Sequence, residues 1–463
     1  MKRIKLLPLL LTLCLLTALL IPCAMADVLD YTTKPESTSK YVVLADLDNQ
    51  KILYSVNEND KAYPASTTKI MTALLAIEAV EREEISLEDM VTAKSGFRYG
   101  ITDDASSAHI KEGETMSLRD LLYCAMLPSA NEACNIIAMY VSGTIGDFID
   151  LMNERAEQLG CTGTHFTNTN GMPDENHYTT AKDLYLISAE ALKHEKFTEI
   201  CDTSSYITAA TNMSDERELY NSNALINPKS VYGSDYVYEG AYGVKTGHTD
   251  DAGHCLVAAA ERGGSHILCV VLGAEGDYES KEYRSFEDTI KLFDWAFGNF
   301  SKRCLLEAGS EVGELPVSLS NGADKVALIT ADGITATAPM GLTSEHLVTK
   351  LVLDSESLVA PVLADTVLGK VELYDESGDY YGSAEVLAKD NVQMDVGEYL
   401  KTAAGAFVMQ NWIIIAAALA GIIIIAFAVV ILRHKARSRK AKPAKAKAPE
   451  KQTKKKTGKR VKK

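Results

Sequence analysis

Between residues 41 and 300, hydrophobic positions alternate in some segments and recur with a helical period in others. The segment YVVLADLDNQKILYSV predicts two short strands joined at Asp48-Asn49. The segment HCLVAAAERGGSHILCVVLGAE predicts two apolar strands joined at Gly263-Gly264. Strands at both ends with helices between them indicate an α+β fold on an antiparallel sheet. The helical patterns cover residues 64–80, 119–141, 146–159, 180–194 and 284–298.

Beyond residue 303 the helical period disappears, and short strands alternate with turn residues until about residue 395. This pattern predicts a small all-β domain, a sandwich, after the α+β domain. Further on, Trp412 to Leu432 forms a run of 21 residues without a charge. At about 1.5 Å per residue this run spans roughly 30 Å, the thickness of a bilayer core, so we expect one transmembrane helix.

The two ends of the chain carry the signals of an exported membrane protein. Basic residues precede an apolar stretch and a small-x-small site ending at Ala26, which predicts a cleaved secretory signal. A lipoprotein signal through Cys23 is less favoured, because bulky residues precede it. Residues 433–463 hold sixteen Lys or Arg and one acid, a positive-inside signal when they follow a membrane span. We therefore expect a single-pass cell-membrane protein with its bulk extracytoplasmic and its basic tail cytoplasmic.

These changes of pattern also give the expected boundaries. They divide the chain into a signal peptide (1–26), an α+β domain (27–300), a β-rich domain (301–397), a juxtamembrane linker (398–411), a transmembrane helix (412–432) and a tail (433–463).

The charge balance narrows the choice of partners. The whole chain has 47 basic and 63 acidic residues, a net charge of −16. Without the signal and the tail, 28 basic and 62 acidic residues remain, a net charge of −34. Such an acidic exterior argues against nucleic-acid binding. Any anionic substrate must be held by a local basic group that acts against this field.

The cysteines indicate packing rather than chemistry. Seven remain after the signal is removed, an odd number without a dense framework, and most stand among apolar residues. We expect most of them to be buried thiols. No cluster of Cys and His has metal-ligand spacing, so we expect neither a metal nor a cofactor.

The segment PASTTKIMTALLAIEAV places Lys69 three residues after Ser66, at the start of an otherwise apolar helix. An i, i+3 spacing puts both side chains on one helix face. The lysine either reaches solvent or lies buried, and a buried lysine loses affinity for its proton. In the second case Ser66 is a nucleophile at a helix N-terminus and Lys69 is the general base. The spacing alone is weak evidence, because Ser37 and Lys40 match it in a polar segment.

A second triplet, Ser129-Ala130-Asn131, lies at a proline-marked break between two helical stretches. The simpler interpretation is an ordinary N-cap, since serine is a favoured capping residue. The functional interpretation makes Ser129 a proton relay and Asn131 a ligand of the substrate amide. The same short pattern occurs again at Ser55-Val56-Asn57, so it too is weak by itself.

A third triplet, Lys245-Thr246-Gly247, lies on a strand that enters the sheet. Gly247 allows a substrate backbone to approach closely, and Lys245 with Thr246 can bind a terminal carboxylate. This supplies the local basic group that an acidic protein needs. A matching triplet at Lys456-Thr457-Gly458 lies in the basic tail.

In order, S-x-x-K, S-x-N and K-T-G resemble the motifs of penicillin-binding proteins and serine β-lactamases. The segments YPASTTKIMTALLA, LLYCAMLPSANEACNIIA and GVKTGHTDDAGHCLVAA are similar to those of the low-molecular-mass D-alanyl-D-alanine carboxypeptidases. The resemblance covers about residues 40 to 300, and the β-rich stretch is similar to the C-terminal domain of that family. One departure is Glu132, where the family usually carries Asp.

The resemblance implies a β-lactamase/transpeptidase-like catalytic domain and a mechanism. Ser66 attacks the penultimate D-Ala carbonyl of a peptidoglycan stem peptide, releases the terminal D-Ala and is freed by water. The backbone N–H groups of Ser66 and His248 hold the oxyanion. β-Lactams acylate Ser66 because they mimic the D-Ala-D-Ala end. We expect Lys69 to be deprotonated in the free enzyme at working pH.

Other functions use the same motifs. A class A β-lactamase needs a glutamate between the second and third motifs, and Glu175 lies in that interval. A transpeptidase or an endopeptidase acting on cross-links would use the same serine. A non-catalytic, membrane-anchored sensor would keep the fold, but the intact Ser66, Lys69 and Ser129 argue against it.

Overall fold

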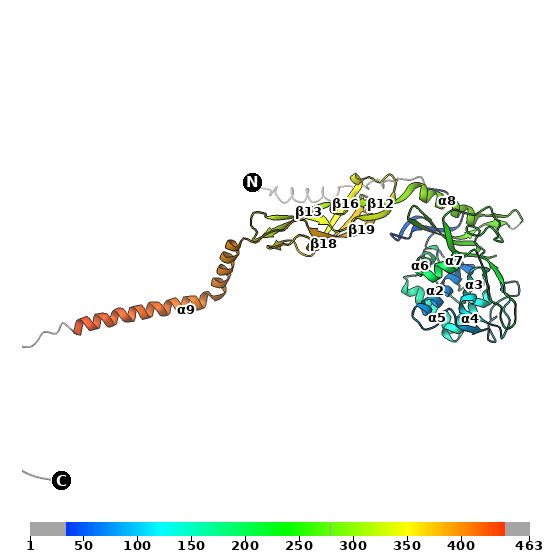
Figure 1. Ribbon diagram of the computed structural model, residues 1–463, viewed down its shortest axis with the longest axis horizontal. Helices are drawn as coiled ribbons and strands as arrows, with labels where there is room; N and C mark the ends of the chain where they lie inside the picture. The colour runs from blue at the N-terminus through cyan, green and yellow to red at the C-terminus, as the bar shows by residue number, and fades with distance from the viewer. Residues whose placement is uncertain (1–33, 278, 440–463) are drawn as a thin grey trace, which may run out of the picture. The chain divides into compact units, whose positions relative to one another are not determined.

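The computed structural model describes residues 34–277 and 279–439 of the chain (Figure 1). The predicted signal peptide and most of the predicted basic tail lie outside the described residues. Two compact units divide the described part. One contains the sheet and helices before residue 300 together with β12, β15, β16, β18 and β19, and the other contains β17 and α9.

An antiparallel five-stranded sheet, in the order β2-β1-β9-β8-β7, forms the centre of the α+β region. Both predicted hairpins are confirmed: residues 47–50 connect β1 to β2, and Gly263-Gly264 connects β8 to β9. The strands are β1 (Tyr41–Asp46), β2 (Lys51–Val56), β7 (Ala241–Thr249), β8 (Gly253–Arg262) and β9 (Ser265–Ala274).

The helices follow the predicted periodicity, and side chains fix several of their starts. Ser117, Thr144 and Thr180 each accept a hydrogen bond from the backbone N–H of an aspartate three residues later. The helices are α2 (Lys69–Glu81), α3 (Leu118–Met126), α4 (Asn131–Ser142), α5 (Ile145–Gln158), α6 (Ala181–Ala191), α7 (Glu195–Asp202) and α8 (Arg284–Asn299). Of these, only α7 was not expected.

The central strands β1, β8 and β9 are buried on both faces of the sheet, so they are apolar at most positions. On β1, Val43 and Ala45 belong to the core shared with α2–α7, whereas Val42 and Leu44 belong to the core shared with α8. Figure 1 shows α2–α7 grouped together and α8 apart from them. A register slip of one residue would exchange these faces, which fixes the position of β7 and its Lys-Thr-Gly triplet.

Short paired strands complete this region. They are β3 (Met90–Thr92) with β4 (Thr115–Ser117), β5 (Ser205–Ile207) with β6 (Glu218–Tyr220), and β10 (Gly276–Asp277) with β11 (Glu282–Tyr283).

The region after residue 300 is β-rich, as expected. Strands β16, β18, β19 and β14 pair in that order, β12 pairs with β15, and β13 pairs in parallel with β17. The strands are β12 (Phe300–Leu306), β13 (Glu311–Ser318), β14 (Lys325–Thr330), β15 (Ile334–Pro339), β16 (Leu347–Leu353), β17 (Leu358–Val359), β18 (Val367–Asp375) and β19 (Tyr380–Ala388).

The last described element is α9 (Val396–Arg439), a helix of 44 residues. It contains the predicted transmembrane run, and it also contains residues 398–411, which the sequence analysis assigned to a linker. Among the described residues, this helix is the one that is long and apolar enough to cross a membrane. The apolar run back to residue 403 covers part of this extension, and the helix begins seven residues earlier, at Val396.

Candidate active site

Ser66 lies in a short 3-10 helix, η1 (Ala65–Thr68), immediately before α2. The helical segment was expected to begin at Pro64, but the α-helical part begins at Lys69. The Pro64 carbonyl accepts hydrogen bonds from the backbone N–H and the hydroxyl of Thr67, at 3.2 and 2.6 Å, which closes the tighter turn. Ala65 has a φ of +47°, an unfavourable value for a residue with a Cβ, and such strain is common at functional sites.

Lys69 is fully buried at the start of α2, so it does not reach solvent. Its Nζ lies 2.7 Å from Ser66 Oγ. The same distance separates Nζ from the side-chain oxygen of Asn131 and from the backbone carbonyl of Asn170. A neutral amine has two hydrogens for these two carbonyl oxygens, which leaves its lone pair for the hydroxyl hydrogen of Ser66. The geometry therefore suits a base directed at the serine.

Burial lowers the pKa of Lys69 to about 8, although the nearby Cys134 and Glu132 act in the opposite direction. A pKa in this range lets the amine accept and return a proton near neutral pH. The protonated form still predominates below about pH 8. The expectation of a deprotonated lysine therefore holds only on the alkaline side of that value.

Ser129 lies in the connection between α3 and α4, after Pro128, with a φ of +67°. It is not the N-cap: that position belongs to Ala130, whose side chain makes no capping hydrogen bond. Ser129 is 7% exposed and lines the cleft beside Ser66, and its side chain has no hydrogen bond to a described residue. The simpler interpretation of this triplet as an ordinary cap is therefore wrong.

Lys245 is buried within β7, and its Nζ donates to the Thr246 carbonyl at 3.0 Å. Burial and the adjacent charge of Lys69 lower the pKa of Lys245 well below its ordinary value. A carboxylate that arrives beside it would oppose this shift by stabilising the charged form. The hydroxyl of Thr246 lies 2.6 Å from that of Ser222, a partner that the sequence analysis did not identify.

Gly247 has a structural role in addition to the expected one. A Cβ at this position would lie 3.0 Å from the Ser66 nitrogen and 3.1 Å from the Pro64 carbonyl oxygen. The missing side chain thus lets β7 pass beside the nucleophile itself. His248 follows directly, and its ring faces that of His254 with centroids 4.3 Å apart.

Six of the eight predicted site residues line one cleft of about 1400 Å³. Lys69 and Lys245 are buried and do not line this cleft. Lys69 contacts Ser66, and Lys245 contacts the Thr246 carbonyl. The six are Ser66, Ser129, Asn131, Thr246, Gly247 and His248.

Two residues that contact the segment of the nucleophile, Asn170 and Gly171, were not predicted from the sequence. Asn170 supplies the carbonyl that accepts from Lys69. Gly171 has a φ of +87°, and a Cβ there would overlap the Ala65 carbonyl. The Asn-Gly dipeptide is a turn signal that could have indicated positive φ, but nothing in the sequence connects it with residues 65 to 69.

Two other residues singled out in the sequence have different roles. Ser37 does not form a catalytic pair, because its hydroxyl donates to Asp288 at 2.9 Å. Glu175 is exposed and does not line the cleft that contains Ser66, so its position gives no support to the β-lactamase alternative.

Glu132 connects the second triplet to the wall of the cleft. Its buried Oε1 accepts hydrogen bonds from the Ser107 hydroxyl at 2.7 Å and from the Ala108 backbone at 2.8 Å. The backbone N–H of Asn131 donates to the Ser106 carbonyl at 2.9 Å. Residues 106–108 line the cleft, so this carboxylate holds a wall of the site in place.

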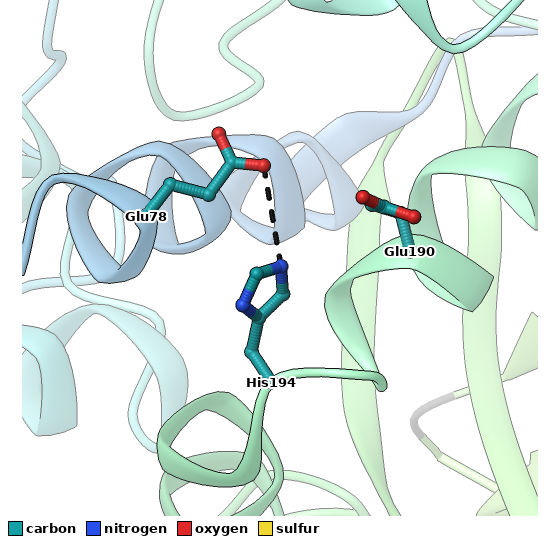
Figure 2. A group of neighbouring side chains, drawn as sticks. All are labelled: Glu78, Glu190 and His194. Carbon is teal, nitrogen blue, oxygen red and sulfur yellow. Dashed lines mark ion pairs between the residues drawn. The ribbon is translucent and has the colours of Figure 1, made fainter. Parts of the chain in front are cut away.

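One group of described side chains, Glu78, Glu190 and His194, has the spacing of metal ligands (Figure 2). The guanidinium of Arg155 already bridges the two carboxylates, at 2.7 Å from Glu78 and 2.8 Å from Glu190. His194 Nδ1 lies 2.7 Å from the carboxylate of Glu81. A metal ion would have to displace this ion pair, so the group is better explained as packing between α2, α5 and α6.

The seven cysteines of the described region are all free. Five are buried, as expected, and burial raises the thiol pKa of each of these five: Cys124, Cys134, Cys201, Cys255 and Cys269.

Comparison with known proteins identifies relatives for both regions. The family model for D-alanyl-D-alanine carboxypeptidase matches residues 30–276, and the model for the C-terminal domain of penicillin-binding protein 5 matches residues 300–394. The chain is 30% identical to the D-alanyl-D-alanine carboxypeptidase DacF of Bacillus subtilis (strain 168) over 364 residues, which cover 78% of this chain and 88% of the relative.

Solved structures of penicillin-binding proteins are also similar to this chain. Penicillin-binding protein 5 from Haemophilus influenzae matches with a TM-score of 0.61 and 29% identity, over 78% of this chain and 99% of that one. A mutant of the Streptomyces K15 DD-transpeptidase matches with a TM-score of 0.51 and 28% identity, over 57% of this chain and 100% of that one. The chain therefore belongs to the D-alanyl-D-alanine carboxypeptidase family, the serine-type hydrolases among the low-molecular-mass penicillin-binding proteins.

Proposed function

We propose that this protein removes the terminal D-alanine from peptidoglycan stem peptides that end in D-Ala-D-Ala, with Ser66 as the nucleophile. The observation that carries the proposal is the position of Lys69. Its buried Nζ contacts the serine and two carbonyl oxygens, the arrangement in which a neutral amine can take the proton of the hydroxyl. The matches to the family support the same reaction.

In the acylation step, Ser66 Oγ bonds to the penultimate D-Ala carbonyl while its proton passes to Lys69. The backbone N–H groups of Ser66 and His248 stabilise the oxyanion. Collapse of the tetrahedral intermediate breaks the peptide bond, and the leaving amine receives a proton through Ser129. Water then attacks the ester and regenerates the serine. Ser129 lines the cleft beside Ser66, and its hydroxyl has no hydrogen bond to a described residue, which suits it to such a relay.

The remaining motif residues bind the substrate in this scheme. Lys245 and Thr246 bind the terminal carboxylate, which restores the charge on the buried lysine. Asn131 orients the amide of the peptide. Gly247 contributes by allowing β7 to lie against the nucleophile. β-Lactams are expected to acylate the same serine, because their ring amide occupies the place of the scissile bond.

A direct assay tests the proposal. The protein without its signal and membrane segments is incubated with a peptide ending in D-Ala-D-Ala, and free D-alanine is measured. A fluorescent penicillin is used in parallel. Release of D-alanine with stable labelling supports the carboxypeptidase, and rapid penicillin turnover without release would indicate a β-lactamase. Absence of both activities would favour a non-catalytic sensor.

A transpeptidase is the second candidate, because the K15 structure of similar fold is described as a DD-transpeptidase. Addition of an amine acceptor separates the two reactions. Transfer to the acceptor in preference to water would identify the transpeptidase, and unchanged hydrolysis would identify the carboxypeptidase.

The proposed location is the cell membrane, with one span at residues 412–432 inside α9 and the catalytic and β-rich domains outside the cell. The length and composition of α9 support the span. The signal at 1–26, the domain boundaries at 300 and 397 and the cytoplasmic tail rest on the sequence. Protease shaving of intact cells that releases the catalytic domain but spares the tail tests this topology.

A further inference from the structure

A buried histidine contacts the turn that carries the nucleophile and has no part in the proposed reaction steps. His177 is 2% exposed, and its Nε2 lies 2.8 Å from the hydroxyl oxygen of Thr68, 109 residues earlier in the chain. Thr68 is 1% exposed and stands directly before the base, Lys69, in the turn that begins with Ala65 and Ser66. The contact therefore reaches the backbone between the nucleophile and the base.

The hydrogen bonds of the His177 ring determine which nitrogen carries the proton. The backbone N–H of Thr167 can only donate, and its nitrogen lies 3.0 Å from Nδ1, so Nδ1 is an acceptor. In a neutral imidazole the proton is then on Nε2, and Nε2–H donates to the oxygen of Thr68. One tautomer satisfies both contacts.

The surroundings of His177 keep the ring neutral. Burial is the main cause, and it lowers the pKa of His177 to about 4. The charge of Asp174 acts in the opposite direction, and those of His165 and Lys69 act in the same direction as burial. Nε2 is therefore a donor and Nδ1 an acceptor at neutral pH.

The contact with His177 takes the place of an ordinary helix cap. Thr68 is at the N-cap position of α2, but its side chain makes no capping hydrogen bond. At the same position of α5 and α6, Thr144 and Thr180 accept from the backbone N–H three residues later. The hydroxyl of Thr68 is thus held by a ring from a distant segment, and not by its own helix.

Two neighbouring contacts join the same segments, but they do not depend on a particular side chain of the distant segment. The Thr72 hydroxyl donates to the Thr169 carbonyl at 2.6 Å, and the Asn170 carbonyl accepts from Lys69. Any residue at positions 169 and 170 has a backbone carbonyl. The contact with Thr68, in contrast, requires a side-chain donor at position 177.

We propose that His177 is a positioning residue for acylation, because its Nε2–H holds Thr68 and thereby fixes the turn between Ser66 and Lys69. His177 does not line the cleft that contains Ser66, so it acts without touching the substrate. Its effect is on the 2.7 Å approach of Lys69 Nζ to Ser66 Oγ, on which proton transfer depends. The inference rests on the proposed function, because it concerns the reactivity of Ser66.

Two substitutions separate the roles of the two ring nitrogens. His177→Gln retains a donor near the position of Nε2, and His177→Asn retains an acceptor near that of Nδ1. The full chain is labelled with a fluorescent penicillin over a range of concentrations, which gives the acylation rate constant and the dissociation constant of the initial complex. His177→Asn should lower the acylation rate constant about tenfold and leave the dissociation constant unchanged, whereas His177→Gln should stay within about threefold of wild type.

Thr68→Val tests the other side of the contact, because valine has nearly the shape of threonine but no hydroxyl. It should lower the acylation rate constant about as much as His177→Asn does. The double variant should be no slower than either single variant, since both substitutions remove the same contact. Circular dichroism and thermal unfolding check that each variant is folded.

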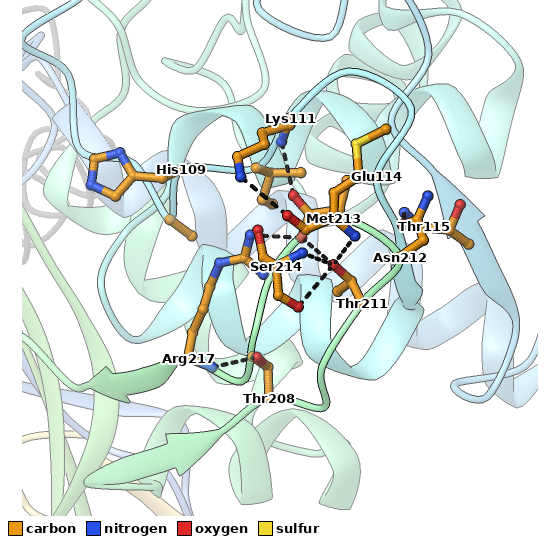
Figure 3. Close-up of polar contacts among 12 residues, drawn as sticks. His109, Lys111, Glu114, Thr115, Thr208, Thr211, Asn212, Met213, Ser214 and Arg217 are labelled. Carbon is orange, nitrogen blue, oxygen red and sulfur yellow. Dashed lines mark hydrogen bonds and ion pairs between the residues drawn. The ribbon is translucent and has the colours of Figure 1, made fainter.

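A matched control comes from a second polar cluster, formed by residues within 109–115 and 208–217 (Figure 3). There the Thr211 hydroxyl donates to Oε1 of the fully buried Glu114 at 2.8 Å, and Arg217 Nη2 lies 2.6 Å from the same oxygen. Thr211→Val removes a threonine hydroxyl from a buried partner, as Thr68→Val does, but in a segment that does not carry the nucleophile. It should be labelled at the wild-type rate.

Equal acylation rate constants for His177→Asn and His177→Gln would overturn the inference, because the donor at Nε2 would then have no effect. So would a double variant about a hundredfold slower than wild type, or a Thr211→Val control as slow as Thr68→Val. If the wild-type chain is neither labelled nor able to release D-alanine, the proposed function fails and the inference fails with it. Labelling of every variant at the wild-type rate would leave the proposed function intact and refute only the role of His177.

Discussion

The pH dependence of acylation follows from the environment of Lys69. Only a neutral amine can take the proton of Ser66, and burial lowers the pKa of this lysine to about 8. For a pKa of 8, the neutral fraction is roughly one tenth at pH 7, one half at pH 8 and nine tenths at pH 9. The acylation rate constant should therefore rise about fivefold from pH 7 to pH 8, and less than twofold from pH 8 to pH 9.

The assay is the second-order rate constant for labelling by a fluorescent penicillin, measured from pH 6 to pH 9. Lys69→Arg should lose the rising limb together with most of the labelling, because a guanidinium does not give up its proton. Lys94→Arg, at an exposed position, is the matched control and should keep the profile. A rate constant that is flat between pH 7 and pH 8, or full labelling of Lys69→Arg, would refute the assignment of Lys69 as the base.

Two further predictions concern residues that support the base and the nucleophile. Gly171→Ala should lower the acylation rate constant about a hundredfold, because the new Cβ would displace the Ala65 carbonyl and the adjacent nucleophile. Gly143→Ala, with the same φ of +87° but open space around it, should acylate normally, and equal rates for the two variants would contradict the account. Glu132→Gln should move the midpoint of the acylation pH profile to lower pH, because its charge raises the pKa of Lys69; an unchanged or higher midpoint would show that this charge does not act there.

Much of the fold was predictable because short-range patterns determine it. The alternation along β1, the Gly-Gly turn between β8 and β9 and the Thr or Ser caps of the helices all act over a few residues. The start of α2 was harder to place. Pro64 is compatible with an α-helix, whereas the structure has a 3-10 turn whose residues 64–66 lie against β7, far away in sequence.

Some residues of the site could likewise be predicted from the sequence, and others could not. The motif residues Ser66, Ser129 and Lys245 could be chosen from local spacing and resemblance, and the structure places their segments around one cleft. Asn170 and Gly171 could not, because their roles consist of contacts with a segment about one hundred residues earlier. Contacts of this kind leave no periodic pattern in the sequence, since each depends on a single backbone approach.

The structural role of Glu132 was also underestimated from the sequence. The retained carboxylate suggested that the departure from the family pattern has little effect. The structure adds that its side chain reaches the backbone of Ala108 and so holds the wall of the cleft. Only the folded arrangement shows that a residue of α4 positions a loop more than twenty residues earlier.

The site of the covalent bond shows whether Ser66 is the nucleophile. The protein is acylated with a penicillin, digested and analysed by mass spectrometry. The account predicts the adduct on the peptide that contains Ser66, and loss of both adduct and D-alanine release in Ser66→Ala. An adduct on another residue, or D-alanine release at the wild-type rate by Ser66→Ala, would contradict it.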